Sequence, residues 1–141
     1  IFEDGTREPL HGHNYHVTVE LEGGLNEGDL VMDFIPFKPV VKELCDAMDH
    51  CTILPTQNDK LKIRQGDEYV EVEFDGKRFQ FASEDVRMLP LPNTSTECLA
   101  RFIGQELTKV IKERFPETTV SQLKIAVSES PGQAGWYSCS L

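Results

Sequence analysis

Two histidines separated by one residue, His11 and His13, are the side chains of this 141-residue chain best spaced to do chemistry. In an extended backbone alternate side chains share a face, so both imidazoles and Tyr15 point the same way as the apolar residues that alternate through Leu21. Each ring nitrogen taken out of water needs a partner, and a zinc ion bound to neutral imidazole is one such partner. The spacing predicts a metal site on the face that should be buried. The alternative is two histidines at the mouth of a strand, hydrogen-bonded to the backbone.

The Asp49-His50 pair, which ends a predicted helix, is a second candidate for chemistry. An acid beside a histidine can move protons, whereas the common structural interpretation is a solvated helix terminus that interacts with the helix dipole. Cys51 follows directly and is a further candidate for a catalytic part. The four cysteines show no paired spacing, so neither a zinc knuckle nor a disulfide scaffold is predicted.

Glu129 continues a row of apolar residues, Leu123, Ile125 and Val127, that share one face of a predicted strand. A carboxylate on a core-facing row is costly unless it binds something. Pterin and purine rings offer paired N–H donors that a carboxylate can accept, which makes Glu129 a candidate ring-binding residue. The alternative is a loop glutamate that has turned out to solvent.

The segment Asn93–Glu97 opens a second predicted helix, with Thr94 three residues before Glu97 as in a capping box. Its hydroxyl groups, including those of Ser95 and Thr96, serve as caps in the simplest interpretation. The free amides of a helix N-terminus also bind polar ligands, so these residues are candidates for ligand contact.

Composition and charge narrow the class of protein. The net charge of −10 argues against nucleic acid or an anionic membrane as the main partner, while a small anionic ligand would need only a local basic patch. Arg7, Lys38 and Arg87 are available for that patch. No apolar run approaches the length of a membrane span and no signal-peptide pattern is present, so we expect a cytoplasmic protein.

The elements that must position these residues are predicted from periodicity. Apolar residues alternate in the strands and recur at helical spacing in the helices. The predicted strands cover 11–21, 30–34, 123–128 and 136–141, and the predicted helices cover 35–48 and the stretch from 93 to the residue before Pro116.

The long connection over 52–91 contains a predicted hairpin, in which 69–74 and 77–81 flank Asp75-Gly76. A two-residue turn there pairs Val72 with Phe79, Val70 with Phe81, and Glu73 with Arg78. The hairpin is interpreted as a structural insertion, with a lid over a site as the alternative.

This order of elements predicts an α+β domain: a four-stranded antiparallel sheet with two helices packed on one face, and the hairpin inserted between the helices. We expect one domain over 1–141 with the insertion at about 52–91. Open sheet edges favour assembly into a homo-oligomer.

Five short motifs stand in the order found in the 6-pyruvoyl tetrahydropterin synthase and 6-carboxytetrahydropterin synthase family, and the chain resembles that family over nearly its whole length outside the insertion. The motifs are His11-Gly12-His13-Asn14-Tyr15, Asp33-Phe34, Asp49-His50, Thr94-Ser95-Thr96-Glu97 and Ser128-Glu129-Ser130-Pro131. The resemblance implies a tunnelling fold, in which three subunits close a barrel and two such rings stack as a dimer of trimers. It also implies a role in tetrahydrobiopterin, folate or queuosine biosynthesis.

The resemblance further implies a zinc ion (Zn2+) held by His11 and His13, with a third histidine ligand expected upstream of Ile1. It implies that Asp49 and His50 form a proton-transfer pair. Family substrates are 7,8-dihydroneopterin triphosphate and close relatives, whose ring would be anchored by Glu129 with Ser95 and Thr96 nearby.

One departure concerns the catalytic cysteine that family synthases place shortly before the first motif histidine. No residue of 1–10 is cysteine, and Glu8 stands three residues before His11. This Glu-x-x-His-Gly-His pattern is similar to the family variant that cleaves the side chain to 6-hydroxymethyl-7,8-dihydropterin. A glutamate is a weak base unless burial raises its pKa. We therefore expect a zinc-dependent lyase; the alternative is a non-catalytic pterin- or purine-binding oligomeric module.

Overall fold

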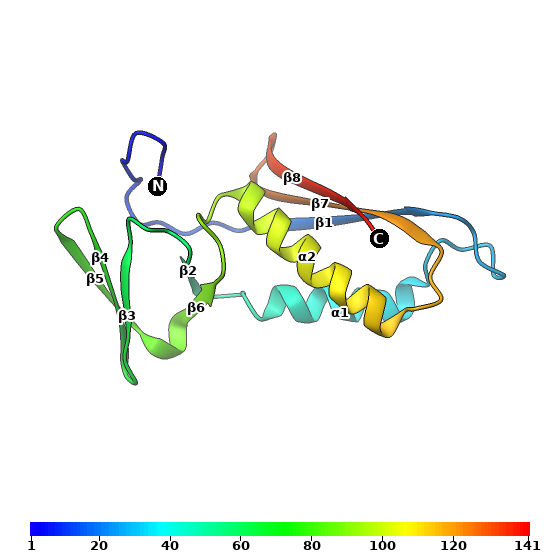
Figure 1. Ribbon diagram of the computed structural model, residues 1–141, viewed down its shortest axis with the longest axis horizontal. Helices are drawn as coiled ribbons and strands as arrows, with labels where there is room; N and C mark the ends of the chain where they lie inside the picture. The colour runs from blue at the N-terminus through cyan, green and yellow to red at the C-terminus, as the bar shows by residue number, and fades with distance from the viewer. The chain divides into compact units, whose positions relative to one another are not determined.

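The computed structural model describes residues 1–141 as two compact units (Figure 1). The first unit combines Ile1–Met32 with Ser95–Leu141, and the second is Asp33–Thr94. The elements in chain order are β1 (His16–Gly23), α1 (Phe34–Asp46), β2 (Thr52–Pro55), β3 (Lys62–Gln65), β4 (Tyr69–Phe74), β5 (Lys77–Ala82), the short 3-10 helix η1 (Ser83–Asp85), β6 (Val86–Leu89), α2 (Thr96–Arg114), β7 (Val120–Ser130) and β8 (Gln133–Ser140). None of the helices is long and apolar enough to cross a membrane.

The first unit is built on an antiparallel sheet of three strands in the order β1-β7-β8. Directly paired residues of antiparallel strands share a face, so Val17 beside Val127 and Ile125 beside Tyr137 lie on one side. Helix α2 packs on the sheet against β7 and β8, as Figure 1 shows. Buried residues of α2 and β7 form the core of this unit, among them Leu99, Ala100, Ile103, Leu107, Ile111, Leu123, Ile125 and Val127.

The predicted fourth strand over 30–34 is wrong, and the sheet has three strands instead of four. The Asn26 side chain accepts hydrogen bonds from the amides of Gly28 (2.9 Å) and Leu30 (3.1 Å), which closes a loop where the prediction required a hairpin turn. The Asp33 carboxylate then accepts from the amide of Ile35 (2.9 Å) and caps α1. A helix begins at Phe34, where the strand was predicted to end. The strand that pairs with β1 is instead β7.

Both predicted helices exist with shifted ends. The first begins and ends slightly earlier than predicted, and the second covers Thr96–Arg114. Its N-cap is Ser95, whose Oγ accepts from the amide of Cys98 (3.4 Å), so the predicted capping box from Thr94 to Glu97 is wrong by one residue. The sheet and α2 belong to the first unit, and α1 belongs to the second. The packing of α1 on the same face of the sheet therefore stays a prediction.

The second unit contains the predicted hairpin. Val72 pairs with Phe79 and Glu73 with Arg78, in the predicted register. Positive φ angles at Asp75 (49°) and Gly76 (69°) suit the tight turn. The insertion is larger than a hairpin, because β3 adds a third strand beside β4 and a separate pair of parallel strands joins β2 to β6. A small core of Leu54, Val70, Val72 and Val86 supports it. The single domain with its insertion stays a prediction.

Gly135 lets β8 pass directly under the first turn of α2. A Cβ at this position would lie 2.3 Å from the amide nitrogen of Glu97 and 2.5 Å from the carbonyl carbon of Thr96. Both are backbone atoms, which cannot move aside as a flexible side chain can. This close approach fixes the N-terminus of α2 over β8.

The substitution Gly135→Ala should therefore lower the free energy of unfolding by about 1–3 kcal/mol, because the added methyl group overpacks the contact. Urea denaturation measures the change. The matched control is Gly24→Ala, whose Cβ would meet only the Thr119 Cβ at 3.9 Å and should change the unfolding free energy little. Equal stability of the two variants would contradict the close approach.

Candidate functional site

Three rings form a row just before β1. The ring centroids of His11 and His13 lie 4.5 Å apart in an edge-to-face arrangement, and those of His13 and Tyr15 lie 5.4 Å apart. The three rings lie on one side of the chain, as the alternation predicts. The predicted strand over 11–21 is wrong at its start, because β1 begins at His16 and the three rings precede it. The row is also less buried than predicted, because 45% of the His11 side chain and 28% of the His13 side chain are exposed.

The hydrogen bond of His11 determines which of its nitrogens is available. Its Nδ1 lies 2.7 Å from the carbonyl oxygen of Pro9, and a carbonyl can only accept, so Nδ1 carries the proton. In neutral imidazole the lone pair is then on Nε2, which lies 3.8 Å from the Glu8 carboxylate. Metal-ligating histidines commonly donate their other N–H to a carbonyl in this way. The His11 geometry fits a metal ligand.

Glu129 lies beside His13, with Oε2 and Nε2 3.7 Å apart. The register of β7 with β8 shifts between Ser128 and Ser130, so Glu129 occupies a bulge. A bulge redirects a side chain out of the regular alternation, which explains why about a third of the Glu129 side chain is exposed although it was predicted on the core-facing row.

Tyr15 is a member of the site that sequence reasoning did not single out as functional. Burial, and then the nearby negative charge of Glu129, raise the pKa of the Tyr15 phenol above its ordinary value of 10. Its parity in the sequence already places it on the face of His11 and His13, but assigns it no role there.

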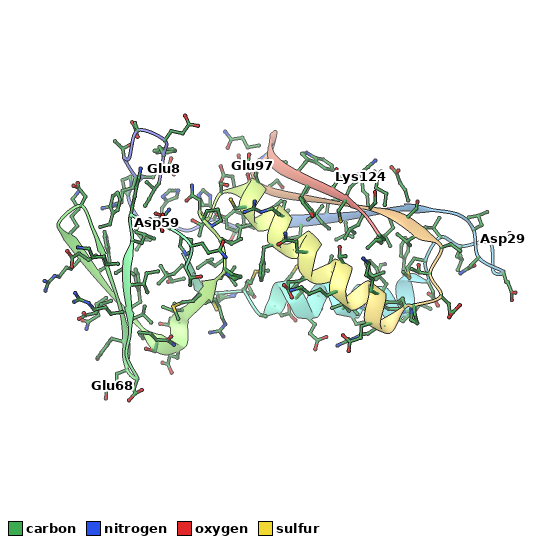
Figure 2. The ribbon with its side chains drawn as sticks, viewed as in Figure 1. Glu8, Asp29, Asp59, Glu68, Glu97 and Lys124 are labelled. Atoms are coloured by element: carbon green, nitrogen blue, oxygen red, sulfur yellow. The ribbon has the colours of Figure 1, made fainter.

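Ser95 and Thr96 lie at the N-terminus of α2, where Figure 2 labels the adjacent Glu97. The Ser95 hydroxyl caps the helix, while the Thr96 hydroxyl lies 3.4 Å from the Glu97 carboxylate. Both residues therefore have structural partners, and contact with a ligand stays a prediction.

Asp49 and His50 belong to the second unit and are paired there, with His50 Nδ1 2.8 Å from Asp49 Oδ2. His50 has a positive φ of 54°, and 92% of its side chain is exposed. The Cys51 thiol donates to the Asp49 carbonyl oxygen at 3.1 Å. The structure joins the acid to the histidine, and their approach to His11 and His13 stays a prediction.

The basic candidates differ in their contacts. Arg87 donates to the carbonyl oxygens of Ala47, Glu84 and Val86, which gives it a structural role. Lys38 lies over the Phe34 ring at 5.8 Å.

Arg7 donates to the carbonyl oxygen of Glu8 at 2.7 Å, and Figure 2 labels Glu8 on the segment that leads into the histidines. Of the three, Arg7 is the one that contacts a predicted site residue.

No group of three or more histidine, cysteine, aspartate or glutamate side chains is arranged to hold a metal ion. His11 and His13 supply two adjacent imidazoles, one of them with a defined lone pair. Their donor chemistry fits two positions of a zinc site, which commonly has three protein ligands when catalytic.

Comparisons with known proteins agree in pointing to one family. The family model described as 6-pyruvoyl tetrahydropterin synthase matches residues 2–139. A putative 6-carboxy-5,6,7,8-tetrahydropterin synthase of Methanocaldococcus jannaschii is 32% identical over 139 residues, which is 97% of this chain and 84% of the relative. Its Pyrococcus horikoshii counterpart is 29% identical over 122 residues, 86% of this chain and 69% of the relative.

Solved structures give the same result. The crystal structure of 6-pyruvoyl tetrahydropterin synthase from Plasmodium vivax is 31% identical, with a TM-score of 0.92 over 98% of this chain and 86% of that chain. A variant of the P. vivax protein in which a catalytic glutamate is replaced by alanine is 30% identical, with a TM-score of 0.93 over 100% of this chain and 87% of that chain.

The electrostatic contact between Glu129 and Tyr15 can be tested without any ligand. In Glu129→Gln the phenol loses the neighbouring negative charge that disfavours its ionised form, so the pKa of Tyr15 should fall toward 10. An NMR titration of the tyrosine ring carbons measures this. Glu20→Gln, which removes a carboxylate from the opposite face of the sheet, is the control and should leave the titration unchanged. An unchanged pKa in Glu129→Gln would show that the two side chains are apart.

Proposed function

This chain belongs to the 6-pyruvoyl tetrahydropterin synthase family, and from that premise we propose that it is a zinc-dependent lyase acting on 7,8-dihydroneopterin triphosphate or a close pterin relative. The observation that carries the proposal is the contact between His13 and Glu129. It brings a nitrogen donor suited to zinc next to a carboxylate suited to the N–H groups of a pterin ring. The synthase names of the relatives favour an enzyme over a non-catalytic binding module.

His11 and His13 are the proposed zinc ligands in this chain, with the third ligand proposed upstream of Ile1. Zinc bound there would supply a Lewis acid that acidifies the hydroxyl groups of the pterin side chain. The Pro9 carbonyl oxygen holds the His11 ring through Nδ1–H and leaves Nε2 for coordination. Glu129 would accept N–H groups of the pterin ring, with Ser95 and Thr96 nearby, and so set the distance from ring to metal.

Glu8 is the proposed catalytic base. Its carboxylate lies 3.8 Å from His11 Nε2 and 61% of its side chain is exposed. Its carboxylate oxygens are acceptors that can take a proton from a substrate bound beside His11. The catalytic glutamate of the P. vivax protein supports a glutamate in this role. We propose side-chain cleavage to 6-hydroxymethyl-7,8-dihydropterin as the reaction.

Asp49 and His50 are proposed to transfer protons to and from the substrate. Their 2.8 Å contact gives the imidazole a carboxylate partner, and the high exposure of His50 leaves its other nitrogen accessible. This is the arrangement that a proton-transfer pair needs.

A homo-oligomer, either a trimer or a dimer of trimers, is proposed as the functional form. Strands β1 and β8 form the two edges of the three-stranded sheet. An edge strand has unpaired backbone groups that another copy can satisfy.

Incubation of the zinc-loaded protein with 7,8-dihydroneopterin triphosphate, followed by mass spectrometry, tests the reaction. We expect 6-hydroxymethyl-7,8-dihydropterin, and removal of zinc with a chelator should abolish its formation. A pyruvoyl or carboxyl product with release of triphosphate would replace the cleavage reaction with the synthase reaction. Absence of turnover with zinc bound would reject both.

Two variants separate catalysis from ring binding. Glu8→Gln should lower kcat by about 100-fold or more with little change in KM, because it removes the base. Glu129→Gln should raise KM by about tenfold or more, because it removes a charged acceptor of ring N–H groups. Steady-state kinetics measures both, and Glu20→Gln serves as the control carboxylate. A normal kcat in Glu8→Gln would exclude it as the base.

A further inference from the structure

We infer that Tyr15 is a positioning residue that holds the His13 imidazole against Glu129; the inference deepens the proposed function and rests on it. His13 lies between two rings, with the His11 centroid at 4.5 Å and the Tyr15 centroid at 5.4 Å. Both distances are in the range of favourable aromatic contacts.

The two histidines are held differently. The Nδ1 of His11 is bound to the carbonyl oxygen of Pro9, which orients that ring. The contacts of His13 are the Glu129 carboxylate and the two neighbouring rings, with no hydrogen bond to the backbone. The orientation of His13 therefore depends on the Glu129 carboxylate and on packing against the two rings, of which Tyr15 is one.

Tyr15 lies at the end of the β1–β7 ladder, between the paired strands and His13. The β1–β7 ladder ends with His16 paired to Ser128. Because the strands are antiparallel, the residue before His16 lies next to the residue after Ser128, so Tyr15 lies beside Glu129 at the end of the ladder. The charge effect of Glu129 on the Tyr15 phenol agrees with this adjacency. One side chain thus contacts His13 and borders Glu129.

This arrangement matters because a metal ligand and a ring-binding carboxylate must be held at a fixed separation for substrate to reach both. A side chain packed against the ligand and adjacent to the carboxylate can set that separation. The ring, rather than the hydroxyl group, is the part of Tyr15 that contacts His13. Tyr15→Phe should therefore preserve the orientation of the His13 ring, and Tyr15→Leu should not.

The test compares Tyr15→Phe and Tyr15→Leu with Tyr69→Leu, a matched control that removes an exposed tyrosine from β4. In the metal-free protein, the NMR signals of the His13 ring protons, assigned with His13→Asn, should shift in Tyr15→Leu and stay near their original positions in Tyr15→Phe. Zinc competition with a chelator should give a dissociation constant about tenfold or more higher for Tyr15→Leu and within about twofold of the original for Tyr15→Phe.

The outcomes test the positioning role of Tyr15 separately from the proposed function. Unchanged His13 signals and zinc affinity in Tyr15→Leu would overturn the positioning role, while turnover by the unsubstituted protein would leave the proposed function intact. Equal losses in Tyr15→Phe and Tyr15→Leu would also overturn it, because the hydroxyl group would then be the part that acts. If the unsubstituted protein binds no zinc, the proposed function fails, and the His13 signals still decide whether Tyr15 orients that ring.

Discussion

The antiparallel pairing of β1 with β7 is the interaction on which the candidate site depends. It joins residues that are more than a hundred positions apart in the chain, with Val17 opposite Val127 and His16 opposite Ser128. The apolar face of β7 is buried under α2, while the apolar residues of β1 beside it are half-buried. A slip by one residue would turn these side chains to the other face of the sheet. The energy of the core therefore sets the register, and the register brings the histidine segment to Glu129.

The site lies where the regular ladder ends, so its polar side chains are accessible to a ligand while the neighbouring core residues stay buried. Within the sheet, Leu123 and Ile125 are fully buried and packed under the helix. Beyond Ser128, the bulge at Glu129 directs a carboxylate to His13 and leaves both side chains about one-third exposed. Groups that must bind a ligand need this access, whereas full burial of an unpaired carboxylate would be costly. The close approach at Gly135 holds the start of α2 over the adjacent strand.

Local signals predicted the parts of the fold that depend on neighbouring residues. The hairpin register was correct because the Asp75-Gly76 turn and the alternation of apolar residues act over a short distance. The strand over 30–34 was wrong because Asp33 caps a helix there, so a side-chain hydrogen bond overrides an apolar run. The cap at Thr94 was wrong because the neighbouring Ser95 also has a suitable hydroxyl, and sequence spacing alone does not choose between them.

The sequence by itself determined the types and order of the candidate site residues: two histidines at alternate positions, a glutamate in place of the expected cysteine, and a glutamate at the end of an apolar row. The five motifs, taken in their order along the chain, were sufficient to indicate the family. The tertiary structure decided which of them meet, placing Glu129 beside His13 and adding Tyr15, because strand pairing and a bulge join distant segments. Side-chain alternation can specify which face a residue occupies, but its neighbour across the sheet depends on packing of the whole core.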